Sequence, residues 1–377
     1  MIDSARYDAS LSSKERKRHG VFYTPEPVVR YLCRATAPAR IVADLSCGDG
    51  AFLVEAAQAG CLVMGIDRDA RALETAAAQL AGVPEDCRCL ICGDGLQPSF
   101  PHVPDVVLGN PPYLEAKKAD KRLKRRCRRL FPAIARGGFD IYLGFLQAGL
   151  DLLPPGGRLG YILPNKVLAA AYARLLREEL LTETTLEEVI DVSDLPTFRD
   201  AAVYPIMLVL RKAPPPPGHQ VTTGHVTDLA QLETGDFPRI PIQQTRWWGT
   251  SSRVFWLPPV EPVGQVLVDR MIGEPRAVPL SSLLEIRWTL SFHRAGLRDR
   301  FIFPQPTGNC PLPLLGGKRF HGNADVRRFG IDWSGWWIDY DEARAKELGN
   351  PLPSRELFAG PKIVLAQNAR RIVATID

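Results

Sequence analysis

Short apolar runs alternate with segments of helical periodicity from residue 19 to residue 212. The apolar runs predict seven strands, at residues 41–45, 62–66, 89–92, 104–109, 158–163, 187–192 and 202–210. The helical pattern predicts helices at residues 25–36, 50–59, 70–80, 139–153 and 166–181. This alternation is typical of an α/β fold with a mostly parallel sheet and helices on both faces. The last two strands have no helix between them, which predicts an antiparallel pair at the sheet edge.

A proline run, Pro214–Gly218, follows the last of these strands. Consecutive prolines form a stiff, extended segment, so we expect a linker over residues 214–219. It would separate a first domain at residues 19–213 from a second at 220–377, with a flexible polar tail at 1–18. All seven Trp residues lie beyond the linker, among short β-like runs rich in Pro and Gly. A smaller β-rich domain with most of these rings in its core is expected.

Acidic residues stand where three of the predicted strands end, at Asp44, Asp67 and Asp94, and a glycine-containing turn follows the first of them. Glycines permit positive φ and let backbone N–H groups approach a ligand closely. An acid about 20 residues after such a turn binds ribose in βαβ nucleotide folds, so Asp67 indicates an adenosine-containing ligand. Leu53 stands where a dinucleotide fingerprint needs its third glycine, which favours S-adenosylmethionine over a nicotinamide cofactor. Taken singly, each acid could also be an ordinary turn or helix-cap residue. The candidate cofactor contacts in the turn are Ser46, Cys47, Gly48 and Gly50.

The tetrapeptide Asn110-Pro111-Pro112-Tyr113 directly follows the fourth predicted strand. The Asn110 side chain and the Pro111 carbonyl can accept hydrogen bonds from an NH2 group, and Tyr113 offers a face for stacking. The prolines stiffen the loop and so aim these acceptors in advance. These four residues are therefore candidate catalytic residues for transfer to a planar exocyclic or amide nitrogen. The alternative is an ordinary proline-rich turn.

A dense run of charge comes just after this loop, with nine cations and one acid between Lys117 and Arg129. Charge runs are often only solvated, but one beside a base-binding loop is well placed to neutralise DNA phosphates. The candidate phosphate contacts are Lys117, Lys118, Lys121, Arg122 and Arg125.

Residues 19–212 resemble the N6-adenine DNA methyltransferases of the TaqI-like, gamma-class group. Besides the glycine turn and the Asn-Pro-Pro-Tyr loop, the matching segments are residues 19–27, 138–145, 154–164 and 195–204. The resemblance implies a Rossmann-like class I methyltransferase domain with S-adenosylmethionine as cofactor, acting on an adenine flipped out of duplex DNA. It implies that Thr24 holds the cofactor carboxylate, Asp67 the ribose and Asp94 the adenine. Phe145 is implied to lie near the cofactor, and Phe198 to stack on the flipped base. Further implied cofactor contacts are Tyr23, Arg68, Gly95, Asn110 and Pro112.

The resemblance continues more weakly from residues 284–288 to residues 374–377, which are similar to the group's target-recognition domain. It implies that a polar loop with Arg287, His293 and Arg294 approaches a DNA groove. Members of the group usually run further, so the chain is either truncated or a short form.

Other substrates fit the same loop. Enzymes that methylate glutamine in release factors share Asn-Pro-Pro-Tyr, but they usually carry a sizeable helical domain before the glycine turn. Cytosine-N4 enzymes more often have Ser at the first position, so Asn110 favours adenine. A non-catalytic specificity subunit would lack Asp67 or Asn110, and both are present. We therefore expect a monomeric, site-specific adenine methyltransferase of a restriction-modification or related defence system, with a cognate restriction endonuclease as a candidate partner.

Composition sets further limits. A chain of 377 residues that is 45% hydrophobic can form two cores, and a net charge of +5 does not by itself specify a partner. The sequence has no apolar stretch of membrane-spanning length and no signal-peptide core, so a cytoplasmic location is expected. Eight unevenly spaced cysteines indicate reduced thiols. Cys87, Cys89 and Cys92 lack a fourth ligand at suitable spacing, so no metal is expected.

Overall fold

In the computed structural model the chain forms two compact units, Met1–Pro275 and Arg276–Asp377. In the first unit the structure describes residues 24–114, 121–134, 139–195, 204–248, 253–255 and 257, and single positions at 264, 266, 270 and 274. In the second unit it describes residues 278, 280–283, 292, 296–314, 326–327, 330–360, 362–365 and 374–376.

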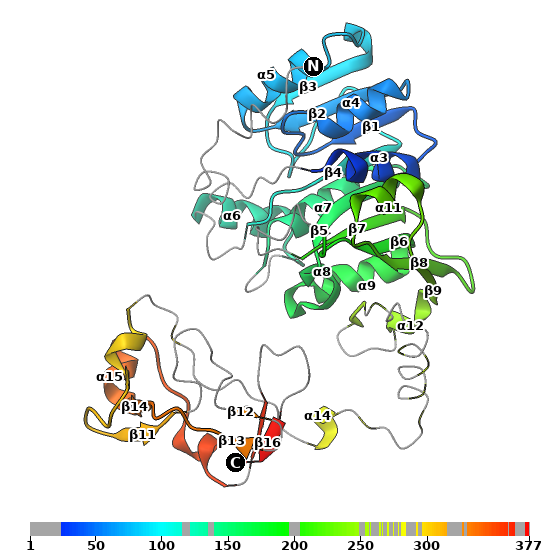
Figure 1. Ribbon diagram of the computed structural model, residues 1–377. Helices are drawn as coiled ribbons and strands as arrows, with labels where there is room; N and C mark the ends of the chain where they lie inside the picture. The colour runs from blue at the N-terminus through cyan, green and yellow to red at the C-terminus, as the bar shows by residue number, and fades with distance from the viewer. Residues whose placement is uncertain are drawn as a thin grey trace. The chain divides into compact units, whose positions relative to one another are not determined.

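The described part of the first unit is built on a nine-stranded sheet (Figure 1). The strands are β1 (Ile41–Asp44), β2 (Leu62–Asp67), β3 (Arg88–Cys92), β4 (Val106–Gly109), β5 (Arg158–Pro164), β6 (Thr185–Asp191), β7 (Pro205–Arg211), β8 (Gln220–His225) and β9 (Arg239–Gln243). Their order across the sheet is β3-β2-β1-β4-β5-β7-β6-β8-β9. Strand β7 runs antiparallel to β5 and β6, and β9 runs antiparallel to β8, while the other neighbours pair in parallel. The seven strands predicted from the apolar runs are thus confirmed.

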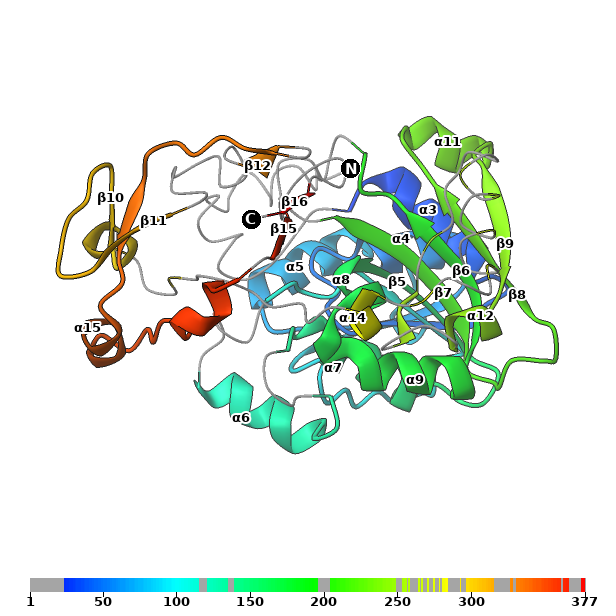
Figure 2. The same ribbon diagram turned by 90° about the horizontal axis from the view of Figure 1, so that it is seen from below.

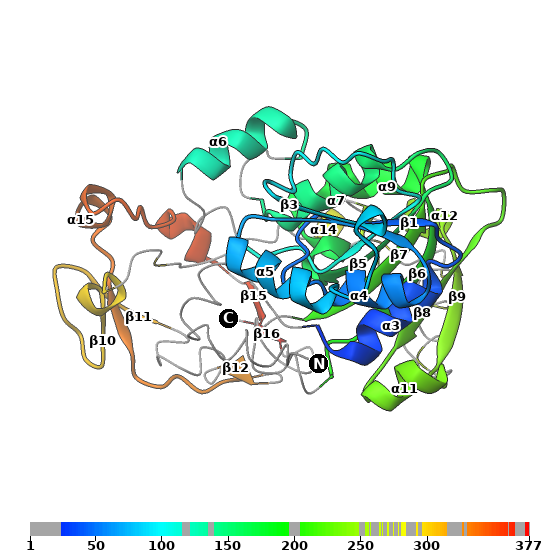
Figure 3. The ribbon, with the colours of Figure 1, turned by 90° about the horizontal axis from the view of Figure 1, so that it is seen from above.

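Helices cover both faces of this sheet, as Figures 2 and 3 show from opposite sides. One face carries α3 (Glu26–Ala35), α4 (Ala51–Gln58), α5 (Ala70–Gln79) and α11 (Leu229–Thr234). The other carries α6 (Lys121–Leu130), α7 (Tyr142–Leu152) and α9 (Arg174–Glu183). The short helix α8 (Lys166–Ala169) packs into the core of this second face. Short elements complete the unit: η1 (Glu85–Cys87), η2 (Ala171–Ala173) and α12 (Thr245–Trp248).

Each face of the sheet has its own buried core, because successive side chains of a strand point to opposite faces. In β4, Val107 packs into the core under α7 and α9, whereas Val106 and Leu108 pack into the core under α3 and α4. A strand buried on both faces needs an uninterrupted apolar run, which is why the central strands could be found in the sequence.

The predicted helix at residues 166–181 is wrong in one respect, because it is broken in the middle. Ala170 is extended (φ −62°, ψ 138°), between α8 and the 3-10 turn η2. The buried Arg177 guanidinium donates to the carbonyl oxygens of Val167 and Ala170, at 2.8 and 2.9 Å. In a continuous helix both carbonyls would accept backbone N–H groups four residues later. At the break the arginine bonds to both of them, and the Ala170 carbonyl also accepts the Ala173 N–H at 3.1 Å.

The predicted domain boundary at residues 214–219 is also wrong. After Pro214–Gly218 the chain returns to the same sheet, because β8 pairs with β6 in parallel and β9 pairs with β8. The compact unit extends to Pro275. For the same reason the antiparallel pair β6–β7 is real but does not form the edge, which β9 forms instead.

The second unit is smaller and its described strands are short. They are β10 (Ile302–Phe303), β11 (Pro311–Pro313), β12 (Val326–Arg327), β13 (Gly330–Ile331), β14 (Trp337–Asp339), β15 (Ile363–Leu365) and β16 (Ala374–Ile376). Around them lie α14 (Leu280–Leu283), α15 (Glu342–Glu347), η4 (Arg298–Arg300) and η5 (Arg355–Phe358). The sheets are β10-β14-β11, β12-β13 and β15-β16.

The expectation that tryptophans form the core of this unit is not met by the described rings. Its buried cluster consists of Leu297, Phe301, Ile338, Tyr340 and Ala345. Trp333 is 42% exposed, and the fully buried Trp247 belongs to the first unit, where it stacks on Phe255 at 4.7 Å between ring centroids.

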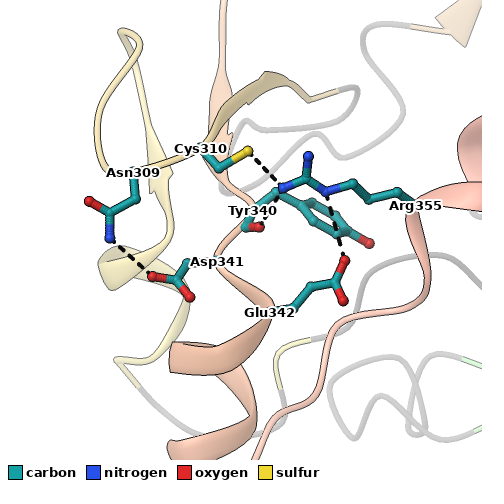
Figure 4. A pocket seen from close by; sticks show the side chains of 6 residues that line it. All are labelled: Asn309, Cys310, Tyr340, Asp341, Glu342 and Arg355. Atoms are coloured by element: carbon teal, nitrogen blue, oxygen red, sulfur yellow. Dashed lines mark hydrogen bonds and ion pairs between the residues drawn. The ribbon is translucent and has the colours of Figure 1, made fainter.

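An open cavity in the second unit lies between β14, α15 and η5 (Figure 4). Arg355 crosses it, donating to Cys310 Sγ at 2.7 Å and to the Tyr340 carbonyl at 3.2 Å, with Glu342 Oε1 3.7 Å from its Nε. The Asn309 amide donates to Asp341 at 3.2 Å. These polar groups satisfy one another, so the cavity is held together by its own side chains. Among the described helices of both units, none is long and apolar enough to cross a bilayer.

Candidate active site

The predicted site residues gather at one edge of the sheet, where the parallel strands β1 to β5 end. Asp44 is the last residue of β1 and Asp67 the last of β2. Asp94 follows β3 by two residues, and Asn110 follows β4 directly. This is the edge at which open α/β sheets bind ligands.

The glycine turn after β1 is fastened to the end of β2. Gly48 has φ +53°, and its N–H donates to Asp67 Oδ2 at 2.9 Å. The other oxygen of the Asp67 carboxylate accepts the N–H of Asp69, also at 2.9 Å. Each oxygen of a carboxylate has about two acceptor positions, so both keep one for a ligand hydroxyl. No described atom lies within 4 Å of the position that a Gly48 Cβ would take, so the turn faces open space.

Gly50 closes the turn and begins α4. It has φ +89°, in the left-handed region, and a Cβ there would lie 3.0 Å from the Ala76 Cβ. Glycine therefore lets the turn and α5 pack closely. Ser46 and Cys47 are held by backbone bonds: the Ser46 N–H donates to Asp44 Oδ1 at 2.9 Å and the Cys47 N–H to the Ile66 carbonyl at 3.1 Å.

Asp44 is only 2% exposed and lies against the end of β4. A Cβ on Gly109 would lie 2.8 Å from Asp44 Oδ1, so only a glycine fits directly before Asn110. Burial, and then the charges of Asp67 and Asp49, raise the pKa of Asp44 to about 8, against the lowering effect of the Ser46 N–H. The contact between Asp44 and Gly109 joins the glycine turn to the Asn-Pro-Pro-Tyr loop.

The Asn110 side chain is oriented by Thr24, which is 7% exposed. The Asn110 amide nitrogen donates to Thr24 Oγ1 at 3.1 Å. Because the nitrogen and oxygen of a carboxamide diverge from the same carbon, this bond turns Oδ1 away from Thr24. The amide oxygen is shielded from solvent within the loop.

Tyr113 lies partly buried beside α7. Its ring meets Tyr142 edge-on, at 6.4 Å between centroids and 86° between planes, and the next N–H, of Leu114, donates to Asp140 Oδ1 at 3.0 Å. Burial, and then the charge of Asp140, raise the pKa of Tyr113 well above its usual value. Its hydroxyl therefore stays protonated, and the ring is fixed from one side.

Asp94 is held by two arginines. Arg68 Nη2 and Arg126 Nε lie 2.5 and 2.8 Å from Asp94 Oδ2, and the Leu96 N–H donates to Oδ1 at 3.1 Å. The neighbouring Gly95 lies so close to the end of β1 that a Cβ there would be 1.7 Å from the Leu45 carbonyl oxygen and 2.8 Å from Phe145 Cε1. Phe145 thus packs against the backbone that leads from β3 into the site.

Only some of the remaining predicted site residues lie in the part of the chain that the structure describes. Pro111 is buried and Pro112 half-buried in the loop, and Lys121, Arg122 and Arg125 are exposed on α6. The predictions that fall outside the described residues are Tyr23, Lys117, Lys118, Phe198, Arg287, His293 and Arg294. Cys87, Cys89 and Cys92 are free thiols, and the part of the chain that is described holds no group of three or more His, Cys, Asp or Glu placed to bind a metal ion.

Arg126 was not singled out from the sequence, although a signal was available. Leu123, Cys127 and Leu130 recur at the spacing of one helix face, and Cys127 is buried. Arg126 stands beside that apolar stripe, so it points inward while its neighbours point to solvent.

Two protein families match the first unit. The family described as methyltransferase small domain matches residues 29–130, and the Eco57I restriction-modification methylase family matches residues 97–198. The cryo-EM structure of a DrdV–DNA complex superposes with a TM-score of 0.51 at 16% identity, over 69% of this chain and 33% of that one. The fold is that of a class I methyltransferase.

The curated proteins similar to this chain include three type II methyltransferases. M.XhoI of Xanthomonas vasicola is 32% identical over 33% of this chain and 23% of its own length. M.VspI of a Vibrio species is 31% identical over 46% of this chain and 44% of its own length. M.TthHB8I of Thermus thermophilus is 29% identical over 94% of this chain and 76% of its own length. The chain therefore spans less than half the length of the first two.

Class I methyltransferases use S-adenosylmethionine, and the strand-end residues fit this cofactor. Asp67 keeps acceptor positions for ribose hydroxyls, and the turn at Gly48 opens onto free space beside it. The missing third glycine is consistent with a ligand that has no pyrophosphate.

Proposed function

We propose that the chain is an N6-adenine DNA methyltransferase of the TaqI-like, gamma-class group, acting in a restriction-modification or related defence system. The observation that carries the proposal is the orientation of Asn110. Its amide nitrogen is bound to Thr24, so its oxygen is turned away from Thr24 at the end of β4. An acceptor suits a substrate that donates hydrogens from an amino group.

The chemistry follows from that acceptor. The lone pair of an adenine amino group is delocalised into the ring, which makes the nitrogen a poor nucleophile. If Asn110 Oδ1 and the Pro111 carbonyl each accept one amino hydrogen, the nitrogen can become tetrahedral and present its lone pair. S-adenosylmethionine supplies the electrophilic methyl group when bound. The protein's contribution is to orient the amino group and to stabilise the positive charge that develops on its nitrogen.

Tyr113 is suited to hold the base. Its ring is fixed edge-on by Tyr142 and its raised pKa keeps it neutral, so it can stack on a purine without bringing a charge into the site. A base reaches this position only by leaving the duplex, at a cost of a few kcal/mol. We assign the second stacking face to Phe198, as the family resemblance implies.

DNA as the substrate is supported from two sides. The relatives named above are type II methyltransferases, and the similarity to M.TthHB8I runs through both compact units. In addition, the exposed cations of α6 come directly after the catalytic loop in the chain. We assign target recognition to the second unit, with Arg287, His293 and Arg294 as contacts, and a cognate restriction endonuclease as functional partner.

The test is to identify the methylated group. The protein is incubated with tritiated S-adenosylmethionine and, separately, duplex DNA, RNA and a release factor, and the product is hydrolysed and separated. Label on N6-methyladenine from DNA is expected. Label on N4-methylcytosine would change the target base, and label on glutamine would replace the proposed substrate altogether.

A further inference from the structure

Helix α6 has two different faces. The outward side chains, Lys121, Arg122, Arg125, Arg128 and Arg129, are all exposed. The inward side carries Cys127, 2% exposed, which packs with Phe131 and Ile134 in the core under α7. A cationic outer face on an anchored helix suits the phosphates of DNA.

Arg126, on the inward side, connects this helix to the predicted cofactor pocket. Its Nε lies 2.8 Å from Asp94 Oδ2, and its Nη2 donates to Gln97 Oε1 at 3.2 Å. Both Asp94 Oδ2 and Arg126 Nε are shielded from solvent. Water cannot readily replace either partner, so the pair holds α6 and the segment after β3 in one arrangement.

The Asp94 carboxylate still has room for a ligand. An ionised carboxylate has about four acceptor positions. Arg68 and Arg126 form ion pairs with Oδ2, and the Leu96 N–H uses one acceptor position on Oδ1. One position on Oδ1 remains, enough for one hydrogen of an adenine amino group. A cofactor can therefore bind Asp94 without displacing Arg126.

We propose that Arg126 is a positioning residue that couples DNA binding by α6 to cofactor binding at Asp94. The proposal rests on the proposed function. Phosphates bound to the outer face fix the helix, the fixed helix keeps Arg126 on Asp94, and the oriented carboxylate then accepts the adenine amino group with less loss of freedom. Because such coupling is reciprocal, a bound cofactor tightens DNA binding by the same factor.

The experiment measures both affinities for the full-length protein at one fixed salt concentration. S-adenosylhomocysteine binding is measured by calorimetry with and without a short duplex oligonucleotide, and duplex binding by fluorescence anisotropy with and without S-adenosylhomocysteine. In the wild type each ligand should tighten the other at least about fivefold. Arg126→Gln should bind S-adenosylhomocysteine about tenfold more weakly and should show no coupling.

Two further variants distinguish the proposed coupling between DNA binding and cofactor binding from a general effect of charge on DNA binding. Arg125→Gln removes a neighbouring outward cation; it should weaken duplex binding by the same factor with and without S-adenosylhomocysteine and keep the coupling. Gln97→Ala changes no charge and removes only the second anchor of Arg126, so it should reduce the coupling even if Arg126→Gln proves too unstable to assay.

Two results would overturn the inference: full coupling in both Arg126→Gln and Gln97→Ala, or no coupling in a wild-type protein that methylates adenine in DNA. The second result leaves the proposed function intact. A wild-type protein that does not methylate DNA would instead remove the proposed function, and this inference with it.

Discussion

Asp67 and Asp94 both lie at the carboxyl ends of strands, but different partners hold them. Asp67 is bound by backbone N–H groups of Gly48 and Asp69, within the βαβ unit that contains it. Asp94 is bound mainly by the side chains of Arg68 and Arg126, the second of which comes from α6. Backbone donors move only if the fold moves, whereas arginines can change partner. The region around Asp67 is therefore held rigidly. The contacts of Asp94, in contrast, can change when a ligand binds to α6.

Substitutions in the rigid region around Asp67 and Asn110 should therefore have large effects on activity, and the largest is expected at Asn110. Asn110→Ala removes the amide acceptor and should lower the rate of methyl transfer by about 100-fold to 1,000-fold, as for loss of other preorganised hydrogen-bonding groups in active sites. S-adenosylhomocysteine affinity should fall far less than the rate, because Asp67 and the glycine turn are untouched and only the implied contact of Asn110 with the cofactor is lost. Single-turnover kinetics and calorimetry measure the two quantities.

A matched variant tests the cause of that loss. Thr24→Val keeps the amide and removes the hydroxyl that orients it, so an intermediate loss of rate, about tenfold, is expected at saturating S-adenosylmethionine, where the implied contact of Thr24 with the cofactor carboxylate does not limit the rate. If Asn110→Ala lost cofactor affinity as severely as rate, Asn110 would be a structural residue rather than a catalytic one.

Gly95 lies where the Asp67 region and the Asp94 region meet. Its replacement should destabilise the folded protein. In Gly95→Ala the new Cβ would lie 1.7 Å from the Leu45 carbonyl oxygen, which is backbone and cannot turn aside. We expect the free energy of unfolding to fall by about 3 kcal/mol, at the upper end for overpacking. Urea denaturation measures it. The control is Gly82→Ala, where no atom of the described residues lies within 4 Å and the change should stay below about 1 kcal/mol. Equal stability of the two variants would show that β1 and β3 tolerate separation.

The same contrast explains what the sequence could and could not predict. Asp44, Asp67 and Asn110 were found because each directly follows or ends an apolar run, and parallel strands bring those ends together. The inward side of α6 could be inferred from its apolar stripe, but the partner of Arg126 could not, because Asp94 lies at a distant strand end and no local pattern pairs residues 94 and 126. The strand β8 was missed because its residues, Gln220–His225, are mostly polar and follow a proline run. Local sequence patterns predict helices and strands. Contacts between side chains that are far apart in the sequence can be identified only from the folded structure.

The pH dependence of stability tests how deeply the rigid region is buried. The folded pKa of Asp44, about 8, lies above the usual value near 4 for an unfolded chain. Between these values the folded protein keeps the proton and the unfolded chain loses it, so stability falls as pH rises through this window and levels off above pH 8. The Asp44→Asn variant has no titrating carboxyl group here, so this pH dependence is removed. The amide oxygen of the new side chain can still accept the Ser46 N–H. The wild-type free energy of unfolding should fall relative to that of the variant by up to about 1.4 kcal/mol per pH unit. Parallel curves from pH 4 to 8 would show that Asp44 is ionised in the fold.

The smallest effects belong to the outer face of α6, because exposed cations act through charge that salt screens. A cation that contacts a phosphate releases counterions on binding, so Arg122→Gln should reduce the slope of log affinity against log salt by about 0.9 and weaken binding only several-fold at moderate salt. The control is Arg40→Gln, whose side chain is 91% exposed directly before β1, at the opposite edge of the sheet. Anisotropy titrations of a duplex over a range of salt give both slopes. An equal change in the two variants would mean that only net charge matters, and α6 would then lose its place in DNA binding, while the Asn110 and Asp67 region would keep its role.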